Sequence, residues 1–253
     1  MKHILVLALG LALLPAGVFA ASLSEWLGIS GNDGRDSVRF NGGWPWVAVG
    51  RLDRADGGHC SATLIGRDRI LTAAHCIVDR DGRQLDPALL RFSAGLDSAG
   101  LDGTRSRAVA SGRRIIVDGA LAFDDDGDIR ALEKDWAVVE LDRQLFDGGW
   151  LRPVPIAPKG TAGAGGERGM TLAQAGYSGD RRDELTRNRT CNMLSLQSGG
   201  RLVVHDCDAT FGDSGSPIMV ETNGDYSILA VHSAIARLDG NVVGLAVIPP
   251  DGF

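Results

Sequence analysis

The chain has 253 residues, of which 44% are hydrophobic and 23% are charged, and its formal net charge is -6. This composition is that of an ordinary globular protein with enough residues to bury a core. The acidic balance argues against nucleic acid, and against an anionic membrane surface, as the main partner.

The first twenty residues have the pattern of an export signal. Lys2 and His3 precede the apolar run Ile4–Leu14, and residues 18–20 (Val-Phe-Ala) form a small-x-small cleavage site. An anchoring helix is the alternative, but the run is shorter than the ~20 residues that a membrane span needs. We therefore expect an exported protein, periplasmic or extracellular, with no membrane span in the mature chain.

Residues 21–40 are polar and glycine-rich, with Arg35 and Arg39 as candidate processing sites. This segment is interpreted either as a short propeptide or as an ordered amino-terminal arm. From Trp44 onward, short apolar runs alternate with Gly, Asp, Asn and Pro. They predict strands at residues 46–50, 61–65, 69–72, 113–117, 136–141, 171–175, 202–204, 217–220, 228–232 and 242–247.

No long stretch has a clear helical period, so the many short strands predict a β-sandwich or β-barrels. The glycine-rich stretch Pro158–Gly169 is a candidate joint between two halves, although an exposed loop has the same composition.

In an exported protein, an even number of cysteines favours disulfides. The four cysteines offer two local pairs, Cys60 with Cys76 and Cys191 with Cys207. Each pair closes a loop of about 16 residues, which the loop-entropy model values at ~3 kcal/mol. A zinc site is the alternative for the first pair, because a histidine precedes each of its cysteines. Export favours the disulfide.

Two motifs place a histidine and an aspartate beside apolar strands. His75 ends the string LTAAH, directly after a predicted strand, and Cys76 follows it. Asp135 begins the string DWAVVEL, where its carboxylate would be buried at the start of a strand. A buried carboxylate needs hydrogen-bond donors, and an imidazole N–H can be one of them.

The string GDSGSP at residues 212–217 has the composition of a nucleophile loop. A serine hydroxyl needs a base to take its proton, and the oxyanion that forms on the substrate needs N–H donors. Glycines allow the sharp turn that brings backbone amides close to a substrate. The amides of Gly212 and Ser214 are therefore the predicted oxyanion hole, although such a string alone also makes a plain turn.

The acidic run at residues 124–128 suggests calcium, but the EF-hand spacing fails because Ala122 stands where the first ligand should be. A solvated loop is the favoured interpretation.

The strings LTAAHC, DWAVVEL and GDSGSP occur in the order His, Asp, Ser, about 60 and then about 80 residues apart. Together they resemble the chymotrypsin-like serine proteases, over a range from about Trp44 to Val247. The likeness is closest to bacterial secreted members, including the glutamyl-endopeptidase-like branch. It is carried by GRDSV, by WPWVAVGRL leading to CSATLIG, by Ser-Gly-Ser-Pro, and by Val-His-Ser at residues 231–233.

This resemblance implies an all-β fold of two six-stranded antiparallel β-barrels packed together, with the active site in the cleft between them. Residues 41–157 would form the first barrel, with His75 and Asp135, and residues 170–253 the second, with Ser214. It also implies that the disulfide Cys60–Cys76 brackets the catalytic histidine.

The implied function is a serine endopeptidase, trypsin-like, that forms an acyl-enzyme on Ser214. His75 acts as general base and acid, and Asp135 orients it. The resemblance implies peptide or protein substrates and requires no cofactor or metal. We also expect a monomer, and the acidic balance argues against nucleic acid as a partner. A catalytically inactive binding protein of the same fold is the alternative. An α/β esterase is disfavoured, since it would need G-x-S-x-G and the order Ser, Asp, His.

Three features depart from the animal enzymes of this family. No Ile-Val-Gly-Gly-like sequence supplies a new amino terminus to pair with Asp213, the residue before the serine. The last predicted strand ends a few residues before Phe253, so we expect no carboxy-terminal helix. The expected disulfide Cys191–Cys207 lies before the serine rather than across the specificity pocket.

Two candidates for the specificity pocket predict opposite preferences. Asp208 lies six positions before the serine, where the trypsin-like pattern has an aspartate that binds Arg or Lys. His232 lies where glutamyl endopeptidases have a histidine that binds a substrate carboxylate. The wall of the pocket would continue with the next three residues, Ser233, Ala234 and Ile235. The β-branched Ile235 would narrow the pocket. Capping of backbone amides by Asp208, and packing of His232 in the barrel, are the structural alternatives. We expect a charged residue to be recognised, and favour Glu over Arg.

Overall fold

The computed structural model describes residues 28–38, 42–79, 81–96, 108–119, 121–124, 129–146, 148–164 and 169–252. The expected signal peptide, Arg39 and residues 125–128 of the acidic run lie outside the described residues. Among the described residues, no helix has the length and apolar character needed to cross a membrane.

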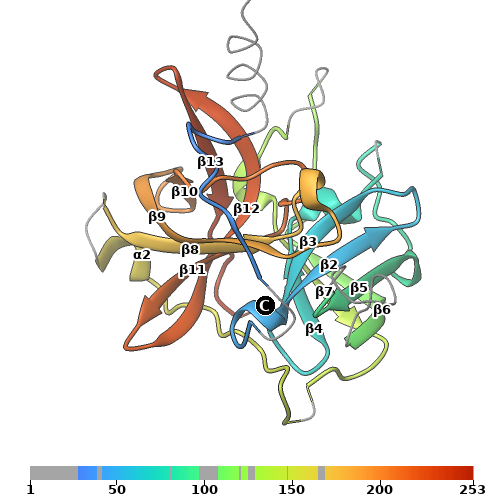
Figure 1. Ribbon diagram of the computed structural model, residues 1–253. Coiled ribbons are helices and arrows are strands. Elements are labelled where there is room, and N and C mark those ends of the chain that lie inside the picture. The colour runs from blue at the N-terminus through green and yellow to red at the C-terminus, as the bar shows by residue number, and fades with distance from the viewer. Residues whose placement is uncertain are drawn as a thin grey trace, which may run out of the picture.

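Six strands in the first half of the chain close into an antiparallel barrel, on the right in Figure 1. They are β2 (Val49–Arg54), β3 (His59–Leu64), β4 (Arg69–Thr72), β5 (Leu90–Ala94), β6 (Ala108–Val117) and β7 (Ala137–Leu141). Their order around the barrel is β2-β3-β4-β7-β6-β5. Fully buried side chains such as Leu52, Leu64 and Phe92 form its apolar core.

A second set of six strands forms the other barrel. They are β8 (Thr171–Gly176), β9 (Thr186–Gln197), β10 (Leu202–His205), β11 (Pro217–Thr222), β12 (Asp225–Leu238) and β13 (Asn241–Val247). Their order is β9-β10-β13-β12-β11-β8, and β8 pairs with β9 to close the ring. The short strand β1 (Asp36–Ser37) adds to β9 from outside. The predicted fold of two six-stranded antiparallel barrels is confirmed.

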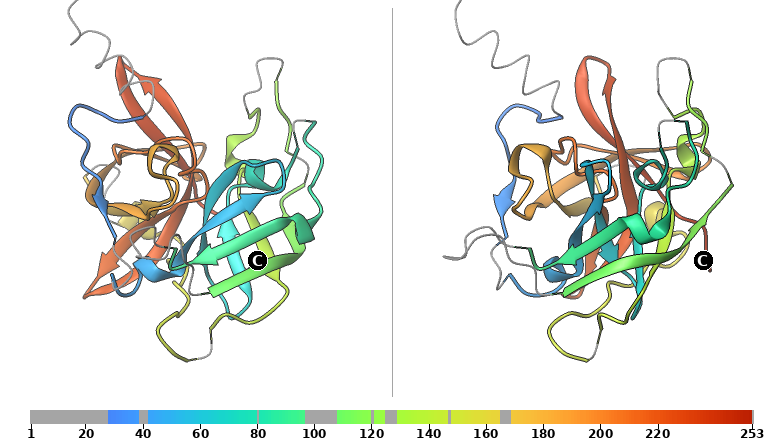
Figure 2. Two further views of the ribbon diagram at one scale, coloured as in Figure 1. Left: turned by 45° about the vertical axis from the view of Figure 1, so that its right-hand side comes forward. Right: turned by 90° about the vertical axis from the view of Figure 1, so that its right-hand side faces the viewer.

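The two barrels pack directly on one another, as the views in Figures 1 and 2 show. One apolar core runs through both, from Val49 and Phe92 in the first barrel to Met219 and Val231 in the second. All strands of the first ring lie within residues 41–157 and all six of the second ring within residues 170–253. The glycine-rich stretch between them contains the short helix α2 (Thr161–Ala164).

One predicted strand is wrong at its start. Residues Trp46–Ala48 form the 3-10 turn η1, and only Val49 begins β2. The turn follows Pro45, whose carbonyl accepts a hydrogen bond from the Ala48 amide. The other 3-10 turns are η2 (Ala74–Ile77), η3 (Pro87–Leu89), η4 (Leu132–Lys134) and η5 (Gly179–Arg181). His75 lies within η2, and Asp135 directly follows η4.

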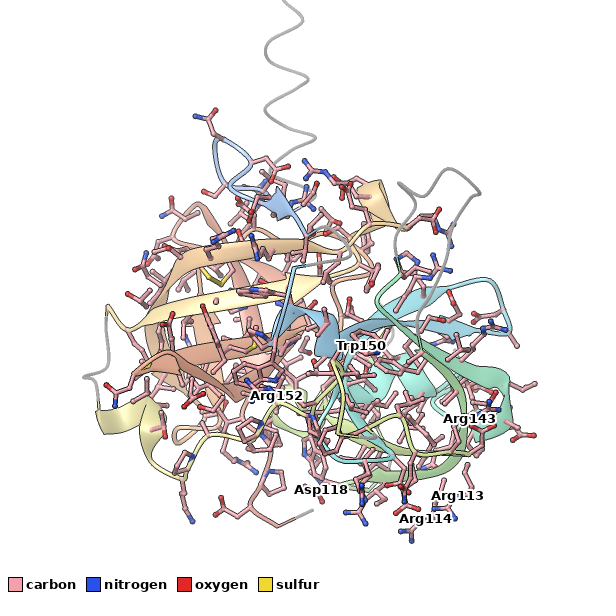
Figure 3. All side chains as sticks on the ribbon, turned by 60° about the horizontal axis from the view of Figure 1, so that its bottom comes forward. Arg113, Arg114, Asp118, Arg143, Trp150 and Arg152 are labelled. Carbon is pink, nitrogen blue, oxygen red and sulfur yellow. A yellow bond between two sulfur atoms is a disulfide. The ribbon has the colours of Figure 1, made fainter. Side chains whose placement is uncertain are left out.

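On β7, the carboxylate of Glu140 is buried. Arg114 binds it through two hydrogen bonds of 2.9 and 2.6 Å, and Arg113 and Arg69 approach it as well. Figure 3 shows Arg113 and Arg114 beside one another at this edge. These ion pairs compensate the buried negative charge of Glu140, on a strand whose other residues are also buried.

Candidate active site

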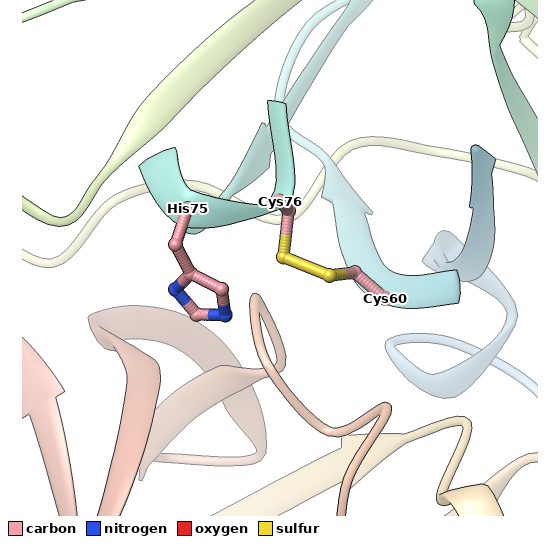
Figure 4. A group of neighbouring side chains, drawn as sticks. All are labelled: Cys60, His75 and Cys76. Carbon is pink, nitrogen blue, oxygen red and sulfur yellow. A yellow bond between two sulfur atoms is a disulfide. The ribbon is translucent and has the colours of Figure 1, made fainter. Parts of the chain in front are cut away.

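A disulfide fixes the turn that holds His75. This turn, η2, follows β4 directly, and Cys76 within it is bonded to Cys60 of β3. Figure 4 shows the imidazole of His75 beside this disulfide. The second disulfide joins Cys191 to Cys207, so both predicted pairings are confirmed. Because both sulfurs of the first pair are bonded to each other, the thiolates that the alternative zinc site would need do not exist here.

Asp135 lies at the end of η4, immediately before β7, and is 0% exposed. Its Oδ1 accepts from the His75 amide at 2.8 Å, and its Oδ2 accepts from His75 Nδ1 at 2.8 Å. Burial raises the pKa of Asp135, but the nearby imidazole and the hydrogen bonds that it accepts outweigh burial and lower the pKa. The ionised carboxylate therefore holds the proton of His75 on Nδ1, which leaves Nε2 able to accept a proton.

Ser233 provides a further donor to Asp135, from the other barrel. It lies on β12, and its hydroxyl donates to Asp135 Oδ2. The sequence placed Ser233 only in the pocket wall. The structure places it in the cleft lining and also against the carboxylate.

Ser214 lies in the loop between β10 and β11 and lines the same cleft as His75. Gly212 and Gly215 in this loop have φ values of 94° and 84°. A side chain is strained in such a conformation, and a Cβ at either position would also meet backbone oxygen atoms. Among the described residues, the amides of Gly212 and Ser214 have no protein acceptor. They are available to a substrate oxyanion.

Ser61, on β3, holds this loop from the first barrel. Its buried hydroxyl donates to the Gly212 carbonyl at 2.9 Å and accepts from the Tyr177 amide at 2.8 Å. Its amide donates to the Ser214 carbonyl at 2.8 Å. Sequence reasoning assigned Ser61 only to a strand, because nothing in its local pattern indicates contacts with residues 212 and 214.

The cleft has a volume of about 830 Å³ and is lined by both barrels. Phe123, Ile129 and Leu132 form one wall, so the flanks of the acidic run border the cleft. The opposite wall comes from β12 and β13 and includes Ala234 and Ile235. Within the described part of the chain, no aspartate or glutamate lines the cleft, whereas two basic residues of β12, His232 and Arg237, do.

His232 is buried on β12 and is joined to a second buried histidine, His205. The Cys207 amide donates to His205 Nδ1 at 3.2 Å, so the proton of His205 is on Nε2. That nitrogen lies 3.2 Å from His232 Nδ1 and donates to it, which places the His232 proton on Nε2. Burial lowers the pKa of His205 to about 3 and that of His232 well below its usual value. His232 is therefore a neutral N–H donor near pH 7.

Asp208 binds backbone amides of the amino-terminal segment. Its Oδ1 accepts from the Ser30 amide at 3.0 Å, and its Oδ2 accepts from the Gly34 amide at 2.7 Å. It is not among the described residues that line the cleft. The two backbone donors satisfy its carboxylate, which corresponds to the structural alternative for this residue.

A family model for the trypsin-like peptidase domain matches residues 60–225, more than half of the chain. The chain belongs to the trypsin-like peptidase family. A similar solved structure is a Glu endopeptidase in complex with MPD, with a TM-score of 0.64. The match covers 87% of this peptidase and 93% of that chain at 20% sequence identity. At this identity the likeness shows a shared fold.

Proposed function

We propose that this peptidase is an exported serine endopeptidase that works through an acyl-enzyme on Ser214. One observation carries the proposal: His75, with its proton held on Nδ1 by Asp135, lines the same cleft as Ser214. Beside the serine are two amides, of Gly212 and Ser214, that have no acceptor among the described residues. The two disulfides are in keeping with an oxidising compartment.

The geometry gives each group a distinct step. His75 Nε2 takes the hydroxyl proton as Ser214 attacks the scissile carbonyl, and Asp135 stabilises the imidazolium that forms. The amides of Gly212 and Ser214 bind the oxyanion, a contribution that is typically worth 10²- to 10³-fold in kcat. His75 then returns the proton to the leaving amine, and water hydrolyses the acyl-enzyme by the same route. An inactive binding protein would not need this set of donors.

We further propose that the pocket accepts an acidic side chain on the acyl side of the cut. His232 provides a neutral N–H donor, while the described lining contains no carboxylate. A substrate carboxylate would gain a charge-assisted hydrogen bond there, whereas a guanidinium would find no carboxylate among the described residues of the lining. Asp208 is occupied by the amides of Ser30 and Gly34. The likeness to a protein called Glu endopeptidase agrees with this assignment.

The test is kcat/KM on matched peptides that end in Glu, Arg, Phe or Ala before the reporter group. We expect Glu to be preferred, and His232→Ala to lower the Glu rate about 10- to 100-fold, as expected for a lost hydrogen bond to a charge. Asp208→Ser is the matched control and should keep the Glu-to-Arg ratio of the parent.

Three results would count against these proposals. An Arg preference that disappears in Asp208→Ser would establish a trypsin-like pocket instead. A Phe or Ala preference that neither variant changes would reject the acidic pocket and leave the catalytic assignment intact. A parent that hydrolyses no peptide, like Ser214→Ala, would support the inactive binding protein.

A further inference from the structure

Residues 28–38, which we call the arm, lie along the second barrel (Figure 2, blue). Asp36 and Ser37 pair with β9, and the Val38 amide donates to the Leu185 carbonyl at 2.8 Å. These contacts hold the arm at the end of the barrel where the nucleophile loop, residues 211–215, begins.

One side chain of the arm, Arg35, is buried in an ion-pair cluster, with 2% of its side chain exposed. Its guanidinium binds Asp33 through two hydrogen bonds of 2.9 Å, and Asp180 through two of 3.0 and 2.8 Å. A buried guanidinium is costly unless nearly all of its donors are satisfied in a fixed geometry. Arg35 therefore holds Asp180 in one position.

Asp180 in turn binds Thr210, the residue that precedes the nucleophile loop. Thr210 Oγ1 donates to Asp180 Oδ1 at 3.1 Å and accepts from the Gly179 amide at 3.0 Å. The Thr210 amide in turn donates to Asp213 Oδ2 at 2.7 Å. The hydroxyl of Ser178 donates to the same oxygen at 2.7 Å. A continuous chain of polar contacts thus runs from the arm to Asp213, whose backbone carries the serine.

The arm contacts the two residues before Thr210 as well. The amides of Ser30 and Gly34 donate to the carboxylate of Asp208, and the Gly28 carbonyl accepts from the Ala209 amide at 3.1 Å. All three residues of the segment 208–210 are therefore linked to the arm, directly or through Asp180. This segment leads into the two amides that are available to an oxyanion.

We propose that the docked arm, through Arg35 and Asp180, positions the oxyanion loop, so that Arg35 is a positioning residue for catalysis. This inference rests on the proposed function. Asp213 Oδ2 accepts hydrogen bonds from the Thr210 amide and the Ser178 hydroxyl, so these two residues of the chain itself hold its carboxylate. Cleavage after Arg35 would separate its guanidinium from the β1 pairing, so the proposal predicts that the active chain retains the arm.

The test compares Arg35→Met with Arg187→Met in the full chain. Arg187 is the matched control because its side chain is 9% exposed and pairs with Asp36 of the same arm, but among the described residues it contacts neither Asp180 nor Thr210. Both variants remove a buried guanidinium that ties down the arm. We expect both to lower the melting temperature. Only Arg35→Met should lower kcat, by about tenfold or more with KM within about twofold, because misplaced oxyanion donors weaken transition-state binding.

Two further variants test the route of the effect. Arg35→Lys should recover only part of kcat, since an ammonium cannot bind two carboxylates with a planar fork. Asp180→Asn should lower kcat in the same way, and the double variant Arg35→Met/Asp180→Asn should be little slower than either single variant. The Asp180 side chain is 37% exposed, so Asp180→Asn decides the question if Arg35→Met does not fold.

The inference is overturned if Arg35→Met or Asp180→Asn keeps the parental kcat per folded molecule, with folding measured by circular dichroism. It is also overturned if Arg187→Met loses as much kcat as Arg35→Met, because any loosening of the arm would then suffice. A parent that hydrolyses no peptide and does not react with a serine-directed reagent would instead reject the proposed function itself.

Discussion

The hydroxyl of Ser233 donates a hydrogen bond to Asp135 across the boundary between the two barrels. The same carboxylate oxygen accepts from His75 Nδ1 at 2.8 Å. The orientation of the proposed base therefore depends on how the second barrel packs against the first.

Replacing Ser233 with alanine should slow catalysis without unfolding the protein. The variant removes one of three donors to a buried carboxylate, and a hydrogen bond to a charge is worth about 1.5–3 kcal/mol. We expect kcat/KM to fall roughly tenfold or more. Ser216→Ala is the control, because the buried Ser216 hydroxyl has no partner among the described residues and its loss should be neutral. Equal rates for Ser233→Ala and the parent would contradict the role of this contact.

Asp135→Asn should impair catalysis much more strongly. An asparagine can present its NH₂ group to His75 Nδ1, which favours the tautomer with the proton on Nε2 and removes the base. The expected loss in kcat is on the order of 10⁴-fold at neutral pH, with the fold retained by circular dichroism. A loss below about tenfold would show that Asp135 does not set the tautomer.

Asp213 gives the peptidase a defined dependence of stability on pH. Complete burial raises the pKa of Asp213 to about 6, although the Thr210 amide, the Ser178 hydroxyl and the charge of Arg35 all lower it; Asp180 adds to the rise. Between pH ~4 and ~6 the folded state thus binds more protons than the unfolded state, so this group lowers the free energy of unfolding as pH rises. The shift of about two pH units corresponds to roughly 3 kcal/mol.

Urea unfolding of the parent and of Asp213→Asn from pH 4 to pH 7 measures this effect. The stability of the parent relative to the variant should fall as pH rises through that window and should be constant above it. A difference that stays flat, or that increases with pH, would mean that Asp213 is ionised in the folded protein at pH 4.

The two disulfides should differ in what their removal does. Each joins cysteines 16 positions apart and should contribute about 3 kcal/mol to the free energy of unfolding. Cys191→Ala/Cys207→Ala should lower stability with a small change in kcat. Cys60→Ala/Cys76→Ala should lower both, because this bond fixes the turn of His75. Thermal unfolding measures the loss of stability in each double variant, and single-turnover rates measure the loss of kcat. Equal losses of kcat in the two variants would contradict the expected difference between the disulfides.

The strands that the sequence predicted are those with continuous apolar runs, such as β4 and β7. The strand β9 was missed because its sequence, TRNRTCNMLSLQ, contains charged and polar residues at buried and exposed positions alike. The strand β5 was missed because LRFSA is short and interrupted by a charge. These strands form because neighbouring strands offer them an edge, which a local pattern does not record.

The candidate site also contains residues that the sequence predicted and contacts that it did not. His75, Asp135 and Ser214 stand in motifs that local sequence identifies. Local sequence does not identify the contacts around them. Ser61 and Gly212 are 151 positions apart in the chain, and Arg35 and Asp180 are 145 apart. Such contacts follow from barrel closure and packing, so only the structure reveals them.

Labelling with a serine-directed phosphonylating reagent, followed by peptide mass spectrometry, tests the central claim most directly. The account predicts one adduct, on Ser214, whose formation parallels the loss of peptide hydrolysis. His75→Ala should react far more slowly, and Ser214→Ala should carry no adduct and lose on the order of 10³-fold or more in kcat/KM while remaining folded. An adduct on a different residue, or a Ser214→Ala variant that cleaves peptides as fast as the parent, would contradict it.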